Sequence, residues 1–106
     1  MLAFAHLSPA QTLEDRLLGN WKCVSGPCDD PEIQFALEDG KRVYNSWLHS
    51  RPSASGGSWK LEGRKLSIEC CERKSPEEWT VMRVSEKHLH LRPAGSRENA
   101  VFRRLK

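Results

Sequence analysis

The chain has 106 residues, of which 38% are hydrophobic and 29% charged, with 17 basic against 14 acidic side chains and a formal net charge of +3. This length allows one domain with a single core and excludes a deep cleft between two domains. Charges of both signs are interleaved, and no apolar run approaches the roughly 18 residues of a membrane span, so we expect neither nucleic-acid binding nor an integral membrane protein.

The first ten residues differ from the rest of the chain. Residues 1–10 are mildly apolar and end in Ser8-Pro9-Ala10, which places small residues at the two positions that a signal peptidase reads. The segment has no basic start and is too short for a whole signal peptide, so we interpret it as the remnant of one or as a disordered tail. We expect residues 11–106 to form the single folded domain.

A short helix is predicted directly after this segment. Thr12 is followed three residues later by Asp15, a variant of the capping box, and three leucines between positions 13 and 18 fall on one helical face. The helix is expected to end at Gly19, where the first extended segment begins.

Short amphipathic segments separated by turn signals make up the rest of the chain. In residues 56–69, apolar and polar side chains alternate on both arms of a hairpin whose turn is Glu62-Gly63. Asp39-Gly40 is another strong hairpin signal, and residues 85–87 join a further pair. The predicted strands cover residues 21–24, 32–38, 43–48, 59–62, 66–70, 79–85, 88–92 and 100–105.

Two parts of this pattern are irregular. Residues 43–48 carry large apolar side chains on both faces, with Tyr44 on one and Trp47 on the other, so we expect burial on both sides or a bulge. The longest polar stretch, His49 to Gly57, predicts a flexible loop that acts as a lid over any ligand. Glu72 to Glu78 predicts a second, charged loop.

The order of the strands predicts how they assemble. Eight sequential antiparallel strands close most naturally into an up-and-down barrel, because closure removes the unpaired edges. The predicted fold class is therefore all-β, an eight-stranded antiparallel up-and-down barrel with a short N-terminal helix. The interior of such a barrel is filled by side chains or holds one small ligand.

One short motif resembles the lipocalins. Leu18-Gly19-Asn20-Trp21 is similar to the Gly-x-Trp signature that opens the first lipocalin strand, and the leucine-bearing turn before it resembles the helical plug of those barrels. In that family the tryptophan packs against an arginine of the last strand. The resemblance implies that Trp21 contacts Arg104, with Arg103 as the alternative, and a guanidinium over an indole is a favourable cation-π contact.

Residues 57–68 resemble the small bacterial lipocalin-like proteins, which carry Gly-x-Trp-Lys-Leu-x-Gly before a Leu-x-Ile strand. This resemblance implies a lipocalin-like binding module, monomeric and exported, with a small apolar or amphipathic ligand in or at the mouth of the barrel. Cys70-Cys71 departs from the family pattern, so we expect the ligand end of this barrel to be closed differently.

A second resemblance gives an alternative function. Bacterial inhibitors of secreted metalloproteases are disulfide-bearing eight-stranded barrels of about this length, and their free N-terminal tail enters the protease cleft. The chain up to Asp15 is the corresponding tail. The alternative is therefore inhibition of a secreted or periplasmic hydrolase through the tail and the rim loops.

The four cysteines are Cys23, Cys28, Cys70 and Cys71. An even number in a small β domain favours disulfides and an oxidising compartment, here the periplasm or the outside of the cell. A zinc site normally uses Cys-x-x-Cys pairs, which the chain lacks. Strand parity favours Cys23 with Cys70 and Cys28 with Cys71, and the other cross-pairing comes second. A bond between the neighbours Cys70 and Cys71 would strain the intervening peptide, which disfavours the third connectivity.

Aromatic residues are the candidates for ligand contact. We expect Tyr44, Trp47 and Trp79 to line a cavity or an open surface, whereas we assign Trp21 and Trp59 to the core. A small hydrophobic ligand is the expected partner, and a secreted or periplasmic protein is the alternative one.

Metal binding and catalysis have little support. His88 and His90 lie two apart on one predicted strand and can supply two metal ligands, but the sequence places no third ligand, so we expect no metal and no cofactor. The chain lacks a Gly-x-Ser-x-Gly elbow, a His-Glu-x-x-His helix and a Gly-rich phosphate loop. We therefore expect a binding protein rather than an enzyme.

Overall fold

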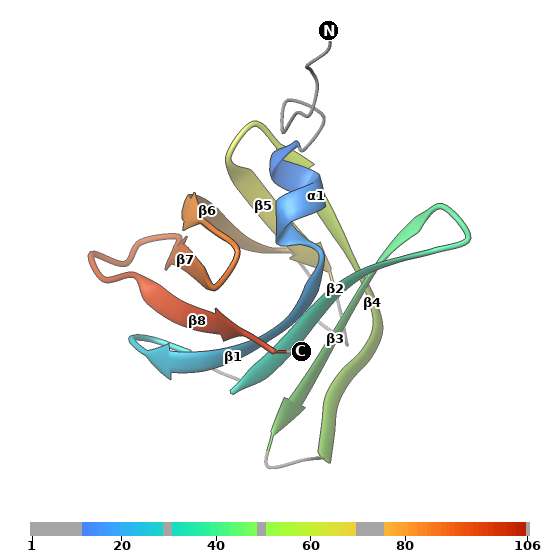
Figure 1. Cartoon of the computed structure of the whole chain (residues 1–106), viewed down its shortest axis with the longest axis horizontal. Helices are drawn as coiled ribbons and strands as arrows, with labels where there is room; N and C mark the ends of the chain where they lie inside the picture. Colours follow the sequence, from blue (N-terminus) through green and yellow to red (C-terminus); the bar gives the residue numbers. More distant parts are fainter. Residues whose placement is uncertain (1–11, 29–30, 49–50, 70–75, 106) are drawn as a thin grey trace, which may run out of the picture.

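The computed structural model describes residues 12–28, 31–48, 51–69 and 76–105. Helix α1 (Leu13–Leu17) is followed by eight strands, and each strand pairs antiparallel with the next (Figure 1). Because β8 also pairs with β1, the sheet closes, and the predicted up-and-down barrel is confirmed. The strands are β1 (Gly19–Ser25), β2 (Glu32–Glu38), β3 (Lys41–Leu48), β4 (Arg51–Glu62), β5 (Lys65–Glu69), β6 (Glu77–Val84), β7 (His88–Pro93) and β8 (Ala100–Arg104).

Tight turns set the register of the hairpins. Asp39 and Gly40, between β2 and β3, have φ values of 53° and 78°, which is the geometry that matches the right-handed twist of the joined strands. Between β6 and β7, the Ser85 hydroxyl accepts a hydrogen bond from the His88 N–H at 3.1 Å. The hairpins predicted at both positions are therefore confirmed.

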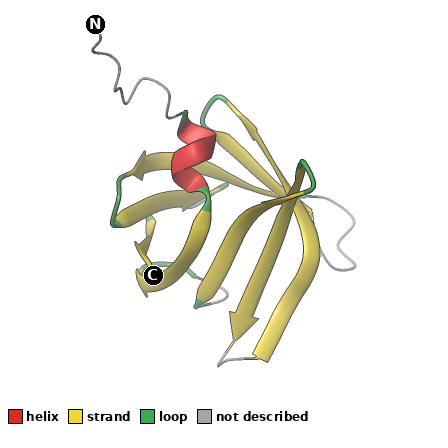
Figure 2. Ribbon diagram, turned by 45° about the vertical axis from the view of Figure 1, so that its right-hand side comes forward, coloured by secondary structure: helices red, strands yellow, loops and turns green. Residues whose placement is uncertain are grey.

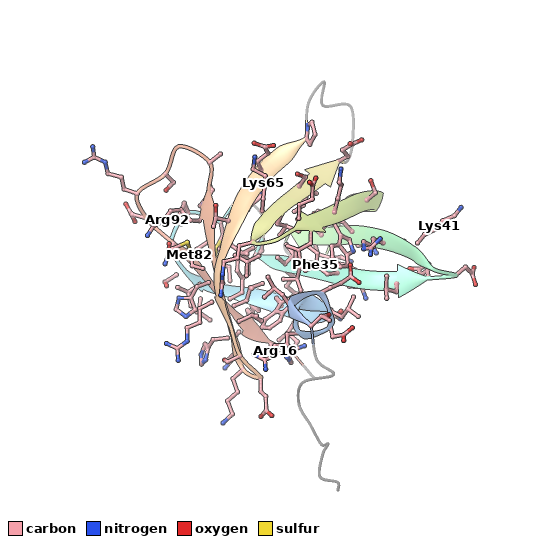
Figure 3. The ribbon with its side chains drawn as sticks, turned by 90° about the horizontal axis from the view of Figure 1, so that it is seen from above. Arg16, Phe35, Lys41, Lys65, Met82 and Arg92 are labelled. Carbon is pink, nitrogen blue, oxygen red and sulfur yellow. A yellow bond between two sulfur atoms is a disulfide. The ribbon has the colours of Figure 1, made fainter. Side chains whose placement is uncertain are left out.

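The core lies inside the barrel, on the inward-facing residues of the alternating strands. Trp21 and Trp59 are both buried, as the sequence predicts. Phe35 packs against Tyr44 and Trp59 with ring centroids 5.5 and 5.6 Å away, and Figure 3 shows it within the barrel. Aromatic pairs at this spacing add about 0.5–1.5 kcal/mol to the stabilisation from burial alone.

The loop predicted for His49 to Gly57 is wrong over most of its length, because the greater part of this stretch belongs to β4. From the Tyr44–Gly57 pair to the Trp47–Pro52 pair, β4 advances five residues while β3 advances three. The two extra residues of β4 are accommodated as β-bulges, which small residues tolerate well. The irregularity expected around residues 43–48 is therefore present in this pairing, and the extra residues lie on β4.

Two further irregularities of the pairing lie beside exposed apolar side chains. The pairing shifts by one residue at Val24 in β1 and at Met82 in β6, and these side chains are 51% and 38% exposed. Arg64, in the turn before β5, donates hydrogen bonds to the carbonyl oxygens of Val81 and Met82 at 2.9 and 3.4 Å. The guanidinium thereby satisfies backbone groups beside the bulge of β6.

Helix α1 covers one end of the barrel (Figure 2). The predicted capping box is present, because Thr12 Oγ1 accepts from the Asp15 N–H at 3.1 Å and the Asp15 carboxylate accepts from the Thr12 N–H at 3.3 Å. Leu17 is fully buried, and its carbonyl oxygen accepts from Trp21 Nε1 at 2.9 Å. None of the helical structure in the described ranges has the length and apolar character of a membrane span.

Arg104, at the end of β8, joins this helix to the barrel. Its guanidinium carbon lies 4.1 Å from the centre of the Trp21 ring. The same group donates hydrogen bonds of 2.7 Å to the carbonyl oxygens of Arg16, Leu18 and Glu86. One side chain therefore holds α1, β1 and the turn between β6 and β7 together.

The contact predicted between Trp21 and the last strand is made by Arg104, whereas Arg103 is exposed on the outer face. Gly19 makes this contact possible. Its φ is +132°, and a Cβ atom there would lie 2.7 Å from Arg104 Nη1. The glycine two residues before Trp21 is therefore required by the close approach of the guanidinium as well as by the backbone conformation.

A second arginine fastens α1 to β3. Arg42 forms an ion pair with Glu14, and its guanidinium carbon lies 5.7 Å from the centre of the Trp59 ring. The hydrogen bond to Glu14, and then the charge of that carboxylate, raise the pKa of the Arg42 guanidinium above its usual value. Arginines of β3 and β8 thus both hold the helix against the barrel. A helix of this length is not stable without such tertiary contacts.

Candidate ligand-binding site

The end of the barrel away from α1 is the candidate site for ligand entry. β1, β3, β5 and β7 end there, and β2, β4, β6 and β8 begin there. We call it the distal end. Because α1 and the buried Leu17 close the other end, a ligand that enters the mouth of the barrel would approach through the distal end.

A hollow of about 360 Å³ lies at the distal end, beside the start of β6. Its wall combines apolar side chains with two carboxylates, which is the usual composition of a small-ligand site. The residues that line it include Pro27, Glu77, Glu78, Trp79, Pro93 and Ala94.

Trp79 forms the aromatic part of this wall. It is 8% exposed, and its Nε1 donates a hydrogen bond to Glu77 Oε1 at 2.8 Å, which orients the indole. On the neighbouring strand Pro93 pairs with Trp79, and the Ala94 N–H donates to the Glu78 carbonyl oxygen at 3.0 Å. The hollow is therefore built on hydrogen-bonded backbone from two adjacent strands.

The other two aromatic residues predicted to contact ligand lie elsewhere. Tyr44 faces the interior of the barrel and packs against Phe35. Trp47 is half-buried and lies on the outward face of β3, opposite Glu32 of β2, because side chains alternate along the strand. Of the three predicted residues, the structure thus places Trp79 at the hollow.

Sequence analysis missed the other residues of the hollow. The predicted strands 21–24 and 88–92 stop before Pro27 and Pro93, and Glu77 falls in the predicted charged loop. A usable signal was present for Glu77, which precedes Trp79 by two residues and therefore lies on the same face of β6. The contribution of Pro27 depends on the fold of the loop after β1, for which the sequence pattern gives no signal.

That loop is closed by a disulfide between Cys23 and Cys28, whose Cα atoms are 6.4 Å apart. The favoured pairing of Cys23 with Cys70 and of Cys28 with Cys71 is therefore wrong, and Cys70 and Cys71 lie outside the described residues. The physical reason is the turn at Gly26, whose φ of +88° reverses the chain and returns Cys28 to Cys23. Strand parity cannot predict such a local reversal.

Removal of this disulfide in a Cys23→Ala/Cys28→Ala variant is expected to lower the free energy of unfolding by about 2 kcal/mol. The loop that it closes has a sequence separation of only 5, so the bond restricts the unfolded chain less than a long-range disulfide would. Urea unfolding of the variant and the oxidised wild type measures the difference. A loss of about 4 kcal/mol, the value for a long loop, would contradict the expectation.

The described interior offers little for other chemistry. Ser46 is its buried polar side chain, and the remaining buried side chains are hydrophobic. His88 and His90 point outward from β7, His88 exposed and His90 half-buried. Within the ranges that the structure describes, no three His, Cys, Asp or Glu side chains are grouped to hold a metal ion.

The fold and this site define the class of protein as a closed eight-stranded up-and-down β-barrel, plugged at one end by a helix and hollowed at the other. No protein-family model matches the chain. No solved structure matches it either.

Proposed function

We propose that this protein is a lipocalin-like binding module that holds a small apolar or amphipathic ligand at the mouth of its barrel. The hollow at the distal end carries the proposal, because it joins the Trp79 indole and two prolines to a pair of carboxylates. The apolar body of the ligand would lie against Trp79 and Pro93. A hydrogen-bond donor or a cationic group of the ligand would reach Glu77 or Glu78.

The closure of the opposite end supports the lipocalin-like part of this proposal. The resemblance to lipocalins implies a contact between Trp21 and an arginine of the last strand. In the structure the Arg104 guanidinium lies over the Trp21 indole, next to Gly19, and donates hydrogen bonds to backbone carbonyl oxygens of the helical plug. The proposed function is binding without catalysis. A catalytic site needs several titratable groups in one water-excluding site, and the described interior is apolar.

The disulfide supports a proposed location outside the reducing cytoplasm. Disulfides persist in oxidising compartments, so the bond between Cys23 and Cys28 fits a periplasmic or secreted protein. The bond also ties down the loop that carries Pro27, one wall of the hollow.

The alternative function, inhibition of a hydrolase through the N-terminal tail, has weaker support. The predicted tail reaches Asp15, but Thr12 to Asp15 form the capped start of α1 rather than a free chain. Residues 1–11 lie outside the described residues. We therefore propose ligand binding ahead of inhibition.

Titration with 1-aminoanthracene, an apolar fluorophore with one amino group, tests the proposed site. Ala94→Trp fills the hollow with a large side chain and is expected to weaken binding of this probe at least about tenfold. Thr80→Trp adds the same side chain at an exposed position on the outer face of β6 and is expected to leave the affinity unchanged. Equal weakening by both variants, or no binding to the wild type, would count against the hollow as the ligand site.

A further inference from the structure

Basic side chains gather on the outer face of β1, β8, β7 and β6, in rows that cross neighbouring strands. In one row Lys22 pairs with Arg103, and Arg103 pairs with His88. In the next row His90 pairs with Arg83. The side chains of both rows are exposed or half-buried, because the residues that alternate with them along each strand face the core. We call this surface the cationic face, and it comprises Lys22, Arg83, His88, His90, Arg92 and Arg103.

The strands that carry the cationic face hold few acidic side chains on their outer side, and Glu86 lies in the turn between β6 and β7. Among the described residues, the outward positions of these four strands hold one carboxylate, Glu78, at the distal end. The ion pairs between Arg42 and Glu14 and between Lys60 and Glu62 lie on other parts of the molecule. Arg92 donates a hydrogen bond from its Nε to Asn99 Oδ1 at 2.9 Å, whereas Lys22, Arg83, His88 and Arg103 are exposed to solvent.

The other side of the barrel has a different character. On the outward positions of β2, β3 and β4, Glu32, Glu38 and Glu62 offset Lys41 and Lys60. Figure 3 shows Met82 and Arg92 on the opposite side of the molecule from Lys41. The two sides of the barrel therefore differ in charge, with the basic side chains concentrated on one of them. The formal net charge of the whole chain is only +3.

Apolar groups accompany the cations on this side. Val24 and Met82, at the irregular pairings of β1 and β6, are exposed large hydrophobic side chains on two of the strands that carry the basic rows. A hollow of about 610 Å³ borders Arg103, and its lining includes Lys87, His88 and Leu105 together with one carboxylate, that of Glu86. A surface that combines exposed aliphatic groups with several cations is suited to a boundary between water and lipid.

We propose that the cationic face docks this protein onto a bilayer surface that contains anionic phospholipid. The lipid phosphates would pair with Lys22 and Arg103 and enter the hollow beside Lys87. Val24 and Met82 would contact the headgroup and acyl-chain boundary. The proposal goes beyond ligand binding at the distal end, because none of these residues lines the hollow that contains Trp79.

A nucleic acid is the other polyanion that a basic surface can bind, and the face is less suited to it. Single strands are held largely by stacking of their bases on aromatic rings. In the described chain, no Phe, Tyr or Trp occupies an outward position on β1, β8, β7 or β6, because Trp21, Trp79 and Phe102 all face the core.

Sedimentation with vesicles tests the proposal. The wild type is expected to bind vesicles of phosphatidylcholine with roughly one-third phosphatidylglycerol at low salt, and to be released by high salt. Each cation near an anionic surface changes binding by a factor of about five, so Lys22→Gln/Arg103→Gln is expected to weaken it roughly tenfold to thirtyfold. Lys41→Gln/Lys60→Gln removes the same charge from the other side and is expected to change it less than about threefold.

Three results would overturn the proposal. The first is equal weakening by the two double variants, which would mean that net charge alone drives binding. The second is binding to pure phosphatidylcholine that matches binding to the anionic vesicles, or no binding to either. The third is tighter binding of a single-stranded oligonucleotide than of the vesicles. Urea midpoints of both variants close to that of the wild type establish that the comparison concerns surfaces and not folding.

Discussion

Replacing Arg104 with alanine is expected to lower the free energy of unfolding by about 3 kcal/mol. The change removes the cation-π contact with Trp21 and leaves the carbonyl oxygens of Arg16, Leu18 and Glu86 without their charged donor. Since domains of this size are stable by only about 5–15 kcal/mol, the loss is a large fraction of the total. Urea unfolding measures it directly, and Tm is expected to fall by roughly 12–20 °C.

Arg103→Ala is the matched control, because it deletes the same side chain one residue earlier on the outer face of β8. It is expected to change the free energy of unfolding by less than about 0.5 kcal/mol. Arg104→Lys keeps the charge but cannot supply the forked set of donors, so it is expected to recover less than half of the loss. Similar effects of Arg103→Ala and Arg104→Ala would show that Arg104 does not close the barrel.

The fold of this chain was predictable because strand alternation and turn chemistry agree over most of its length. Asp39-Gly40 has the positive φ values that its sequence implies, and the alternating side chains on either side place one face of each strand inside. The seam between β1 and β8 joins residues far apart in sequence, and it was predictable through the resemblance of Gly19 and Trp21 to a known motif. The alternation of side chains alone does not identify Arg104 as the partner of Trp21.

The failures have local causes. The stretch after β3 is rich in serine and glycine. Both a bulged strand and a flexible loop favour these residues, so composition could not distinguish the two structures. The disulfide depends on a chain reversal at Gly26, within a sequence separation of 5, whereas the predicted pairing assumed that Cys23 and Cys28 point to distant strands. Both errors concern backbone conformations that break the period of two.

The cationic face could not be predicted for a different reason, because here the strands keep their period of two. Because a strand shows every second residue on one face, the basic side chains of β1, β6, β7 and β8 appear in the sequence as isolated charges among apolar residues. Only the register, which sets Lys22 beside Arg103 and Arg83 beside His90, brings them together. The interleaved charges that argued against a polyanion partner thus assemble into one face in the folded barrel.

Gly26→Ala is expected to lower the free energy of unfolding by about 3 kcal/mol. This loss is larger than the cost of placing alanine at a positive φ alone. A Cβ atom at this position would lie 2.2 Å from the Asn99 carbonyl oxygen and 2.9 Å from Ala100 Cα. Ala100 is held by its pairing with Leu91, so β8 cannot yield and the loop after β1 must move. That movement would displace Pro27 from the hollow as well as strain the fold.

Gly95→Ala separates the two parts of this effect. Gly95 has a φ of +81°, close to the +88° of Gly26, but nothing lies within 4 Å of the Cβ position. The variant therefore carries the conformational penalty without the clash, and it is expected to lose only about 1 kcal/mol in urea unfolding. Equal losses in the two variants would mean that the loop beside the disulfide moves freely, and that Gly26 does not seat it against β8.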